Sequence, residues 1–227
     1  MPKAFEIKSV GGTEVMNFVE HHLDPSGPSE NHIRIKQNAV GVNYIDTYHR
    51  SGIYPVSLPC VLGIEAVGDV VSIGSGVSDL RVGQRVGYAS APIGAYTEER
   101  DFPADKVVNI PDSISDIEAA SVLLKGMTVE YLFNRTYNIK KGEFFLFHAA
   151  AGGVGLLACQ WSRAIGAKMI GTVSNKVKAD LARNAGCDFV LNYKEDNIVK
   201  RVMEITNGRG VSVAYDGVGI ETFQKTI

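Results

Sequence analysis

A short apolar run that leads directly into a glycine-rich corner constrains the fold of this sequence more than any other feature. Residues 144–147 are Phe-Phe-Leu-Phe, residues 148–155 are His-Ala-Ala-Ala-Gly-Gly-Val-Gly, and a helical apolar pattern follows. A strand, a tight turn and a helix in this order begin a dinucleotide-binding βαβ unit. Gly152 would let the backbone approach a pyrophosphate and Gly155 would permit close helix packing, with Ala150 where the first glycine of the fingerprint is usual. A plain α/β turn whose small residues serve only packing is the alternative.

The sequence after this turn continues as α/β. Further strands are predicted at residues 168–173, 189–192 and 211–216, each preceded by a helix, which predicts a right-handed parallel sheet. A six-stranded dinucleotide fold needs two more strands after Asp216, so we expect a truncated chain with an incomplete nucleotide-binding domain. The apolar faces predicted for the three helices are Val154, Ala158, Trp161 and Ile165; then Val177, Leu181 and Ala185; then Ile198, Val202 and Ile205.

Residues 1–110 have a different, β-rich pattern. Short strands are expected at residues 4–7, 15–19 and 32–36, and repeated glycines in Val-rich segments are typical of a small, partly closed barrel. Residues 43–52 break the alternation and predict a helical turn that ends at a glycine and carries polar and aromatic side chains. The remaining strands are predicted at residues 66–73, 82–88, 94–98 and 106–110.

A change of period follows Pro111. Ser115 and Glu118 have the spacing of a capping box, which predicts a helical region that is interrupted at Gly126 and continues to about Tyr137.

Composition excludes several classes of protein. The formal net charge of −2 gives no general attraction to nucleic acid or to anionic membranes. Three cysteines that lie far apart, with no CxxC pair, are typical of reduced thiols in a cytoplasmic protein. No apolar run approaches the roughly 20 residues of a membrane span, and no signal peptide opens the chain.

The segment after the second α/β strand bears on the cofactor. NAD-preferring sites have an acidic residue about 20 positions beyond the glycines, but residues 172–178 contain none. Ser174 and Lys178 could pair with a 2′-phosphate that a carboxylate would repel, so NADP(H) is favoured over NAD(H). Alternatively the lysines only solvate a helix face, which suits Lys176.

No metal or nucleophile pattern stands out. Cys60 has no neighbouring cysteine, and no Gly-x-Ser-x-Gly elbow is present. Cys159 falls on an inner helix stripe, and His148 suits a packed, hydrogen-bonded position at a strand end better than a catalytic base. We therefore predict no metal site.

The sequence resembles the medium-chain dehydrogenase/reductase superfamily, in particular its zeta-crystallin-like NADPH:quinone oxidoreductase branch. Within this branch it is most similar to the bacterial members. The segments that carry the resemblance are residues 43–48, 62–65, 82–86, 123–128 and 148–155, in the family's order. The resemblance implies a GroES-like catalytic domain at residues 1–124, a Rossmann domain at residues 125–227, an active cleft between them and a homodimer.

The resemblance also implies a zinc-independent site. In zinc-dependent relatives the positions of Asp46 and Ile64 hold a Cys and a His ligand, and both are replaced here. Gln84 stands where the family usually has Asp, which we expect to affect a turn rather than the chemistry. The family's C-terminal segment, which completes the cofactor site, is not in this sequence.

By resemblance, Asn43 and Thr128 would lie beside the nicotinamide, and Tyr48 and Tyr54 would line the quinone pocket. The remaining implied residues are Ala151, Gly152, Gly153, Val154 and Gly155 for the pyrophosphate, Ser174, Lys178 and Tyr193 for the 2′-phosphate, and Val218 near the cofactor.

Together with the acid-free cofactor segment, the resemblance implies an NADPH-dependent quinone reductase in which solvent or Tyr48 protonates the product. Hydride and single-electron transfer both stay open. The alternatives are reduction of an enone or alkenal double bond, and a non-enzymatic role as a crystallin or RNA-binding protein. The net charge and the absence of a basic, aromatic stripe argue against RNA.

Overall fold

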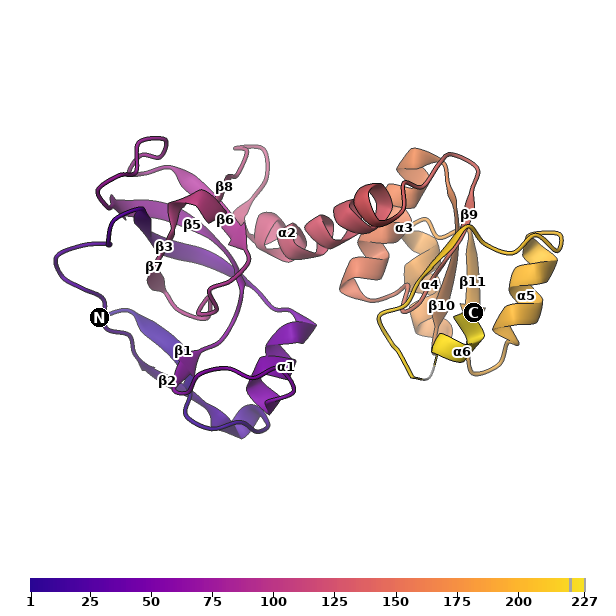
Figure 1. Ribbon diagram of the computed structural model, residues 1–227, viewed down its shortest axis with the longest axis horizontal. Coiled ribbons are helices and arrows are strands. Elements are labelled where there is room, and N and C mark those ends of the chain that lie inside the picture. The colour runs from indigo at the N-terminus through magenta and orange to yellow at the C-terminus, as the bar shows by residue number, and fades with distance from the viewer. Residues whose placement is uncertain (221, 227) are drawn as a thin grey trace. The chain divides into compact units, whose positions relative to one another are not determined.

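The computed structural model describes residues 1–220 and 222–226, and the chain forms two compact units, Met1–Leu124 and Lys125–Ile227. The first unit is built from antiparallel sheets and the second from a parallel sheet with helices (Figure 1). None of the described helices is long and apolar enough to cross a membrane.

The described part of the N-terminal unit contains a larger and a smaller antiparallel sheet. The larger has the order β7-β3-β5-β6-β8, and the smaller has the order β2-β1-β4. The bounds are β1 (Lys3–Ile7), β2 (Met16–Glu20), β3 (His32–Gly41), β4 (Cys60–Val61), β5 (Glu65–Ile73), β6 (Arg85–Ala89), β7 (Glu99–Pro103) and β8 (Val108–Asn109). Short 3-10 turns cover Thr13–Val15 and Ala104–Lys106, and helix α1 is Tyr44–Ser51.

The alternation predicted for the third strand is confirmed. Ile33 and Ile35 of β3 are fully buried, and they pack in one core with Tyr88 and Phe102, whose rings stack at 4.0 Å between centroids. The strand predicted at residues 94–98 is wrong. That segment is a connection in which Tyr96 N–H donates to Leu62 C=O (2.7 Å), and β7 begins only at Glu99.

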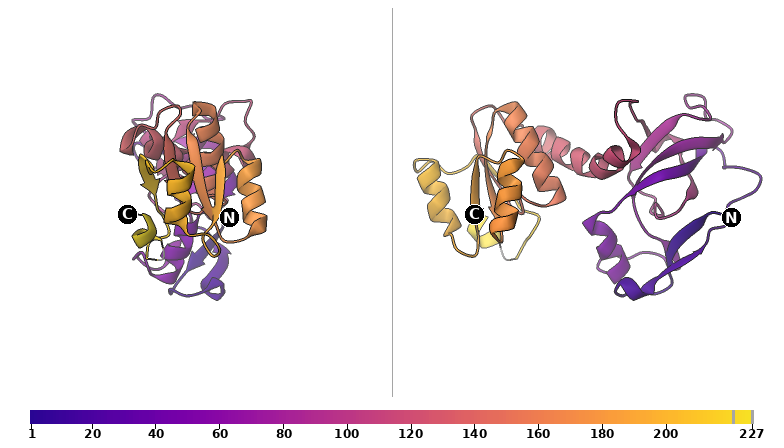
Figure 2. Two further views of the ribbon diagram at one scale, coloured as in Figure 1. Left: turned by 90° about the vertical axis from the view of Figure 1, so that its right-hand side faces the viewer. Right: turned by 180° about the vertical axis from the view of Figure 1, so that it is seen from behind.

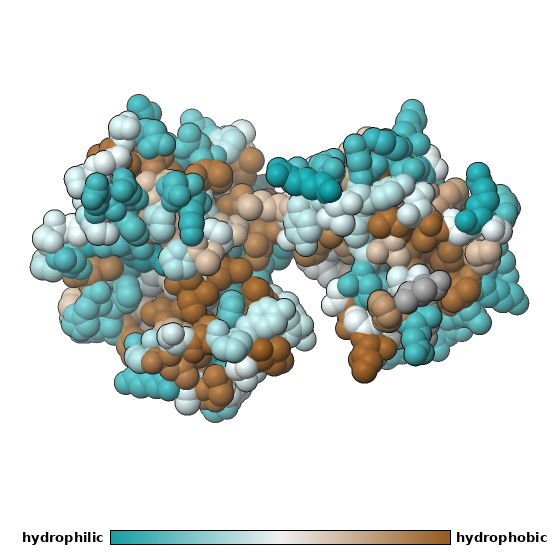
Figure 3. All heavy atoms as spheres, viewed as in Figure 1, coloured by the Kyte–Doolittle hydropathy of each residue, from teal (hydrophilic) through white to brown (hydrophobic). Residues whose placement is uncertain are grey.

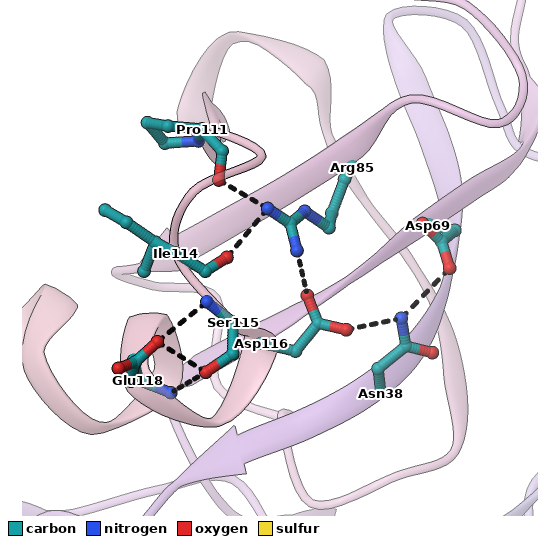
Figure 4. Close-up of polar contacts among 8 residues, drawn as sticks. All are labelled: Asn38, Asp69, Arg85, Pro111, Ile114, Ser115, Asp116 and Glu118. Carbon is teal, nitrogen blue, oxygen red and sulfur yellow. Dashed lines mark hydrogen bonds and ion pairs between the residues drawn. The ribbon is translucent and has the colours of Figure 1, made fainter.

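Helix α2 (Asp116–Glu130) starts at the predicted capping box. Glu118 accepts from Ser115 N–H (2.9 Å), and Ser115 Oγ accepts from Glu118 N–H (3.2 Å). The guanidinium of Arg85 reaches Asp116 at 3.3 Å and also donates to the carbonyl of Ile114, which fastens the helix start to β6 (Figure 4).

The interruption predicted at Gly126 is wrong, because α2 runs straight through this residue. A Cβ on Gly126 would meet no atom within 4 Å, so this glycine is tolerated in the helix and is not needed for a bend. The helical path then widens into a π-helical segment, Tyr131–Thr136, and ends at an extended Tyr137. Gln84 takes part in the turn before β6, where its side-chain oxygen accepts from Arg81 N–H (3.0 Å).

The C-terminal unit contains the predicted parallel sheet, with strand order β11-β10-β9-β12. Its two faces bury different helices. Phe145 packs with residues of α3 and α4, whereas Leu146 packs with α5 on the other face, so helices flank the sheet on both sides (Figure 2). The bounds are β9 (Phe144–Phe147), α3 (Gly153–Ile165), β10 (Lys168–Val173), α4 (Lys176–Asn184), β11 (Phe189–Asn192), α5 (Ile198–Ile205), β12 (Val213–Tyr215) and α6 (Phe223–Thr226).

The faces predicted for α3 and α5 are confirmed. The face predicted for α4 is wrong at Val177 and Leu181, and only Ala185 of that face packs on the core. Val177 and Leu181 are 72% and 48% exposed, whereas Ala179 and Ala182 are buried. The helix therefore packs on the core through alanines, whose small side chains allow a close approach, and its larger apolar residues stay in solvent.

A pair of glycine-to-alanine variants tests the packing of Gly41 at the end of β3 against β5 and α2. In Gly41→Ala the new Cβ would overlap the carboxylate of Glu65 and the carbonyl oxygen of Ala120, so we expect a loss of about 1–3 kcal/mol in the free energy of unfolding. In Gly126→Ala, the matched control in an open helical position, we expect a gain of about 0.5–1 kcal/mol. Urea denaturation followed by far-UV circular dichroism measures both. Equal stabilities of the two variants would contradict this packing.

Candidate functional site

The turn between β9 and α3 brings a helix start close to the ends of the strands. Ala149 adopts a left-handed conformation (φ 56°), and Gly152 N–H donates to Ala149 C=O (2.8 Å) to close the turn. A Cβ on Gly155 would lie 2.6 Å from backbone atoms of Ala150, which confirms the predicted close packing at Gly155. The N–H groups of the first turn of α3, which belong to Gly153, Val154 and Gly155, therefore lie directly after the turn.

The alanine in the first glycine position has a structural explanation. The residue with a positive φ is Ala149 and not Ala150, which is fully buried. A Cβ on Gly171 of β10 would lie 2.6 Å from the Ala150 methyl group, so the second strand leaves the room that this methyl group needs. The deviation from the fingerprint therefore leaves the close turn intact.

A pocket of about 160 Å³ opens beside this turn. It brings together six of the residues that the sequence predicted for the cofactor: Ala151, Gly152, Ser174, Lys178, Tyr193 and Val218. It is smaller than the roughly 300 Å³ at which ligand pockets usually begin, so it can hold only one part of a dinucleotide.

The pocket suits an anion. Lys178 lies in the first turn of α4, where Asn175 caps the helix by accepting from Lys178 N–H (2.9 Å). A helix N-terminus carries a partial positive charge, and the Lys178 ammonium adds a full one. Among the described residues that line the pocket, none is acidic. The combination favours a phosphate over a neutral ribose hydroxyl.

The other predicted cofactor residues lie outside the pocket lining. Val154 packs its side chain on the core, so it could meet a ligand only through its backbone N–H. A Cβ on Gly153 would lie 3.0 Å from the aliphatic carbons of the Lys125 side chain. Thr128 is a partly buried residue of α2. Lining residues that the sequence did not indicate are Ala149, Thr172, Val173 and Thr222.

A polar network underlies this pocket. His148 is buried, with Nδ1 at 2.9 Å from Thr172 Oγ1 and Nε2 at 3.0 Å from Thr226 Oγ1, as predicted for a hydrogen-bonded strand-end residue. Asp216 accepts from Val218 N–H (2.8 Å) and from the Thr222 hydroxyl. Burial alone would raise the pKa of Asp216, but these bonds and one from the Gly219 N–H outweigh it and hold the pKa below its usual value. The network fixes the loop that carries two lining residues.

The predicted substrate residues of the N-terminal unit lie around α1. Asn43 is the N-cap residue, almost fully buried, and its backbone N–H donates to Asp46 (2.9 Å). Its side-chain amide donates to Glu65 (2.7 Å). Tyr48 and Tyr54 lie together, with ring centroids 5.2 Å apart, and Tyr54 N–H donates to Tyr48 C=O (3.1 Å).

The two positions that bind zinc in zinc-dependent relatives have other contacts here. Asp46 is buried and accepts from the Tyr96 hydroxyl (2.7 Å), and burial together with this bond raises the pKa of Tyr96. Ile64 is a buried apolar residue without a ligating atom. The described residues contain no group of three or more His, Cys, Asp or Glu side chains that could hold a metal ion.

An apolar groove of about 300 Å³ lies on the same unit, and the sequence did not indicate it. Apolar side chains gather over this region of β1 and β2 in Figure 3. Its lining comes from separate segments, which explains why no local pattern shows it: Phe5, Met16, Phe18, Val40, Val42 and Tyr96 are among the residues.

Comparisons with known proteins agree with this architecture. A family model described as "Alcohol dehydrogenase GroES-like domain" matches residues 29–112, and one described as "Zinc-binding dehydrogenase" matches residues 153–227. Together they confirm the predicted α/β fold class with a GroES-like and a Rossmann part.

Similar proteins and structures cover the whole chain. A quinone oxidoreductase of Salmonella typhimurium is 50% identical over 228 residues, which is 100% of this chain and 69% of that protein. A 2-haloacrylate reductase of a Burkholderia species is 42% identical, over 100% of this chain and 69% of that protein. The crystal structure of Escherichia coli quinone oxidoreductase complexed with NADPH is 49% identical with a TM-score of 0.95, covering 99% of this chain and 68% of that one. The chain therefore belongs to the quinone oxidoreductase family of the medium-chain dehydrogenase/reductase superfamily.

Proposed function

We propose that this protein reduces quinones with NADPH and needs no zinc. The observation that carries the proposal is the acid-free pocket in which Ser174 and Lys178 lie beside the glycine turn. A relative named quinone oxidoreductase at 50% identity, and a similar structure that holds NADPH, support the same cofactor and substrate class.

The residues of the C-terminal unit fit NADPH, which when bound supplies the reducing electrons from its nicotinamide ring. The first-turn N–H groups of α3 and the adjoining residues Ala151 and Gly152 would hold the pyrophosphate. Ser174, Lys178 and Tyr193 would hold the adenosine 2′-phosphate, and Val218 would line the loop next to it. Thr128 would contact the nicotinamide, as the family resemblance implies.

The N-terminal unit would supply the substrate side. Asn43 would orient the nicotinamide, and the adjacent rings of Tyr48 and Tyr54 would pack on a flat quinone. A quinone is already electrophilic, so its reduction does not require a Lewis acid to polarise a carbonyl group. Tyr48 or solvent would then protonate the reduced oxygen.

The chemistry of the two replaced ligand positions supports zinc independence. Asp46 is engaged by the hydroxyl of Tyr96 and the backbone of Asn43, and Ile64 cannot ligate a metal.

A second candidate is reduction of an activated carbon–carbon double bond. The relative named 2-haloacrylate reductase, 42% identical over the whole chain, favours this alternative. The same arrangement would serve both reactions, because each delivers electrons to an electron-poor conjugated system. We further propose that the protein is a cytoplasmic homodimer. The family resemblance supports the dimer, and three cysteines that lie far apart, with no CxxC pair, are typical of a reducing compartment.

Cofactor preference tests the role of Lys178. In Lys178→Ala we expect NADPH to bind about 10- to 100-fold more weakly, because one charge-assisted bond to the 2′-phosphate is lost, and NADH to bind within about twofold of wild type. Lys176→Ala, in the same turn but outside the pocket lining, should leave both affinities unchanged. Isothermal titration calorimetry measures the constants. Equal losses for NADPH and NADH in Lys178→Ala would refute the 2′-phosphate role.

Turnover tests the substrate class. We expect NADPH absorbance at 340 nm to fall with 1,4-benzoquinone, more slowly with an enone, and not without an electron acceptor. Dialysis against a chelator should leave the quinone rate within about twofold, because Asp46 and Ile64 replace the Cys and His ligands of zinc-dependent relatives. A faster rate with the enone would favour the second candidate, and no turnover of any quinone would reject the proposed function.

A further inference from the structure

A carboxylate lies in the interior of the N-terminal unit with no exposure to solvent. Glu65, the first residue of β5, has 0% of its surface exposed. One of its oxygens accepts from the side-chain amide of Asn43 (2.7 Å), and the other accepts from the backbone N–H of Leu124 (2.7 Å). Burial of a carboxyl group costs free energy unless such bonds compensate it, so its presence here calls for an explanation.

The fold leaves room for this side chain. Gly41, the last residue of β3, pairs directly with Glu65 across the two strands. A Cβ on Gly41 would overlap the carboxylate, so a glycine at this register position is a condition for the buried acid. The space and these donors come from two segments that are distant in the sequence, residues 41–43 and Leu124, which argues for a built arrangement.

The carboxylate determines the direction of the Asn43 amide. A carboxylate only accepts hydrogen bonds, so the NH₂ end of the amide must face Glu65 and the carbonyl oxygen must face away. The backbone of the same residue is fixed by the bond from Asn43 N–H to Asp46 (2.9 Å). Two buried carboxyl groups thus hold the main chain and the side chain of one residue.

We propose that Glu65 is a positioning residue, which sets the direction of the Asn43 side-chain amide for the reduction. This inference rests on the proposed function, in which Asn43 orients the nicotinamide. A misplacement of about 1 Å in such a group can lower a rate about 100-fold, so the direction of the amide matters to the reaction.

A purely structural role makes a different prediction. If Glu65 served only to hold Leu124 and the helix α2, its loss would lower stability and leave the Asn43 amide unaffected. The variant Glu65→Gln separates the two roles, because glutamine offers one acceptor oxygen and one NH₂ group to the Asn43 amide and the Leu124 N–H, which both donate to Glu65. With its oxygen on Leu124 N–H, its NH₂ group would face Asn43 and force that amide to turn over.

The experiment is a double-mutant cycle on the purified protein with Glu65→Gln, Asn43→Ala and the double variant. We expect kcat/KM for the quinone to fall about 10- to 100-fold in Glu65→Gln, and no further fall when Glu65→Gln is added to Asn43→Ala. The melting temperature should change little. The matched control is Glu20→Gln, since Glu20 forms an exposed ion pair with Lys3, and this variant should keep the wild-type rate.

Additive losses in the cycle, or a loss of stability with an unchanged kcat/KM, would overturn the proposal. The side-chain amide signals of Asn43 in ¹⁵N spectra, assigned through Asn43→Ala, give a second readout that needs no turnover. They should shift in Glu65→Gln and stay in place in Glu20→Gln, and unshifted signals would equally overturn the inference. Absence of quinone turnover in the wild type, with shifted signals, would instead reject the proposed function alone.

Discussion

The close approach of α3 to the end of β9 is the contact on which the candidate cofactor site depends. It exists because Gly155 has no side chain where a Cβ would meet the backbone of Ala150 at 2.6 Å. This contact puts the free N–H groups of a helix start beside the carboxyl ends of parallel strands, where α/β proteins bind phosphate. A larger residue would push the helix away and widen the turn, and the pocket between Gly152 and Lys178 would lose one wall.

The same principle operates in the N-terminal unit. Gly41 leaves the space in which the buried carboxylate of Glu65 meets Asn43. In the same way, Gly155 and Gly171 leave the space that the turn between β9 and α3 needs. In both units the candidate functional groups are polar: the carboxylate of Glu65 in one and the N–H groups at the start of α3 in the other. In each case a glycine on a neighbouring strand or helix leaves the space for them. Such constraints act between segments that are distant in the sequence.

Local patterns predicted what depends on neighbours in the chain. The alternation at Ile33 and Ile35, the capping box at Ser115 and Glu118, and the order of strands and helices after residue 144 are confirmed. The helical spacing of apolar residues wrongly predicted that Val177 and Leu181 face the core, because tertiary packing determines which face of α4 is buried. In the structure, alanines of α4 contact the core and these two larger side chains are exposed.

The candidate site divides along the same line. Ser174 and Lys178 could be named from the acid-free segment after the second α/β strand, and Tyr193 from the family resemblance, and the structure brings them into one pocket. Thr222 could not, because a loop brings it to the pocket and no motif marks it. Glu65 was visible only as part of a motif, and its hydrogen bonds to Asn43 and Leu124, 22 and 59 positions away, appear only in three dimensions.

We propose that the pocket beside the glycine turn recognises a 2′-phosphate through Ser174 and Lys178. The most direct measurement compares the binding of 2′,5′-ADP and 5′-AMP, which differ only in that group, by isothermal titration calorimetry at low ionic strength. We expect 2′,5′-ADP to bind at least about 10-fold more tightly than 5′-AMP. This difference in affinity should shrink with increasing ionic strength, because salt screens the charge of Lys178. Equal affinities for the two nucleotides, or tighter binding of 5′-AMP, would contradict it.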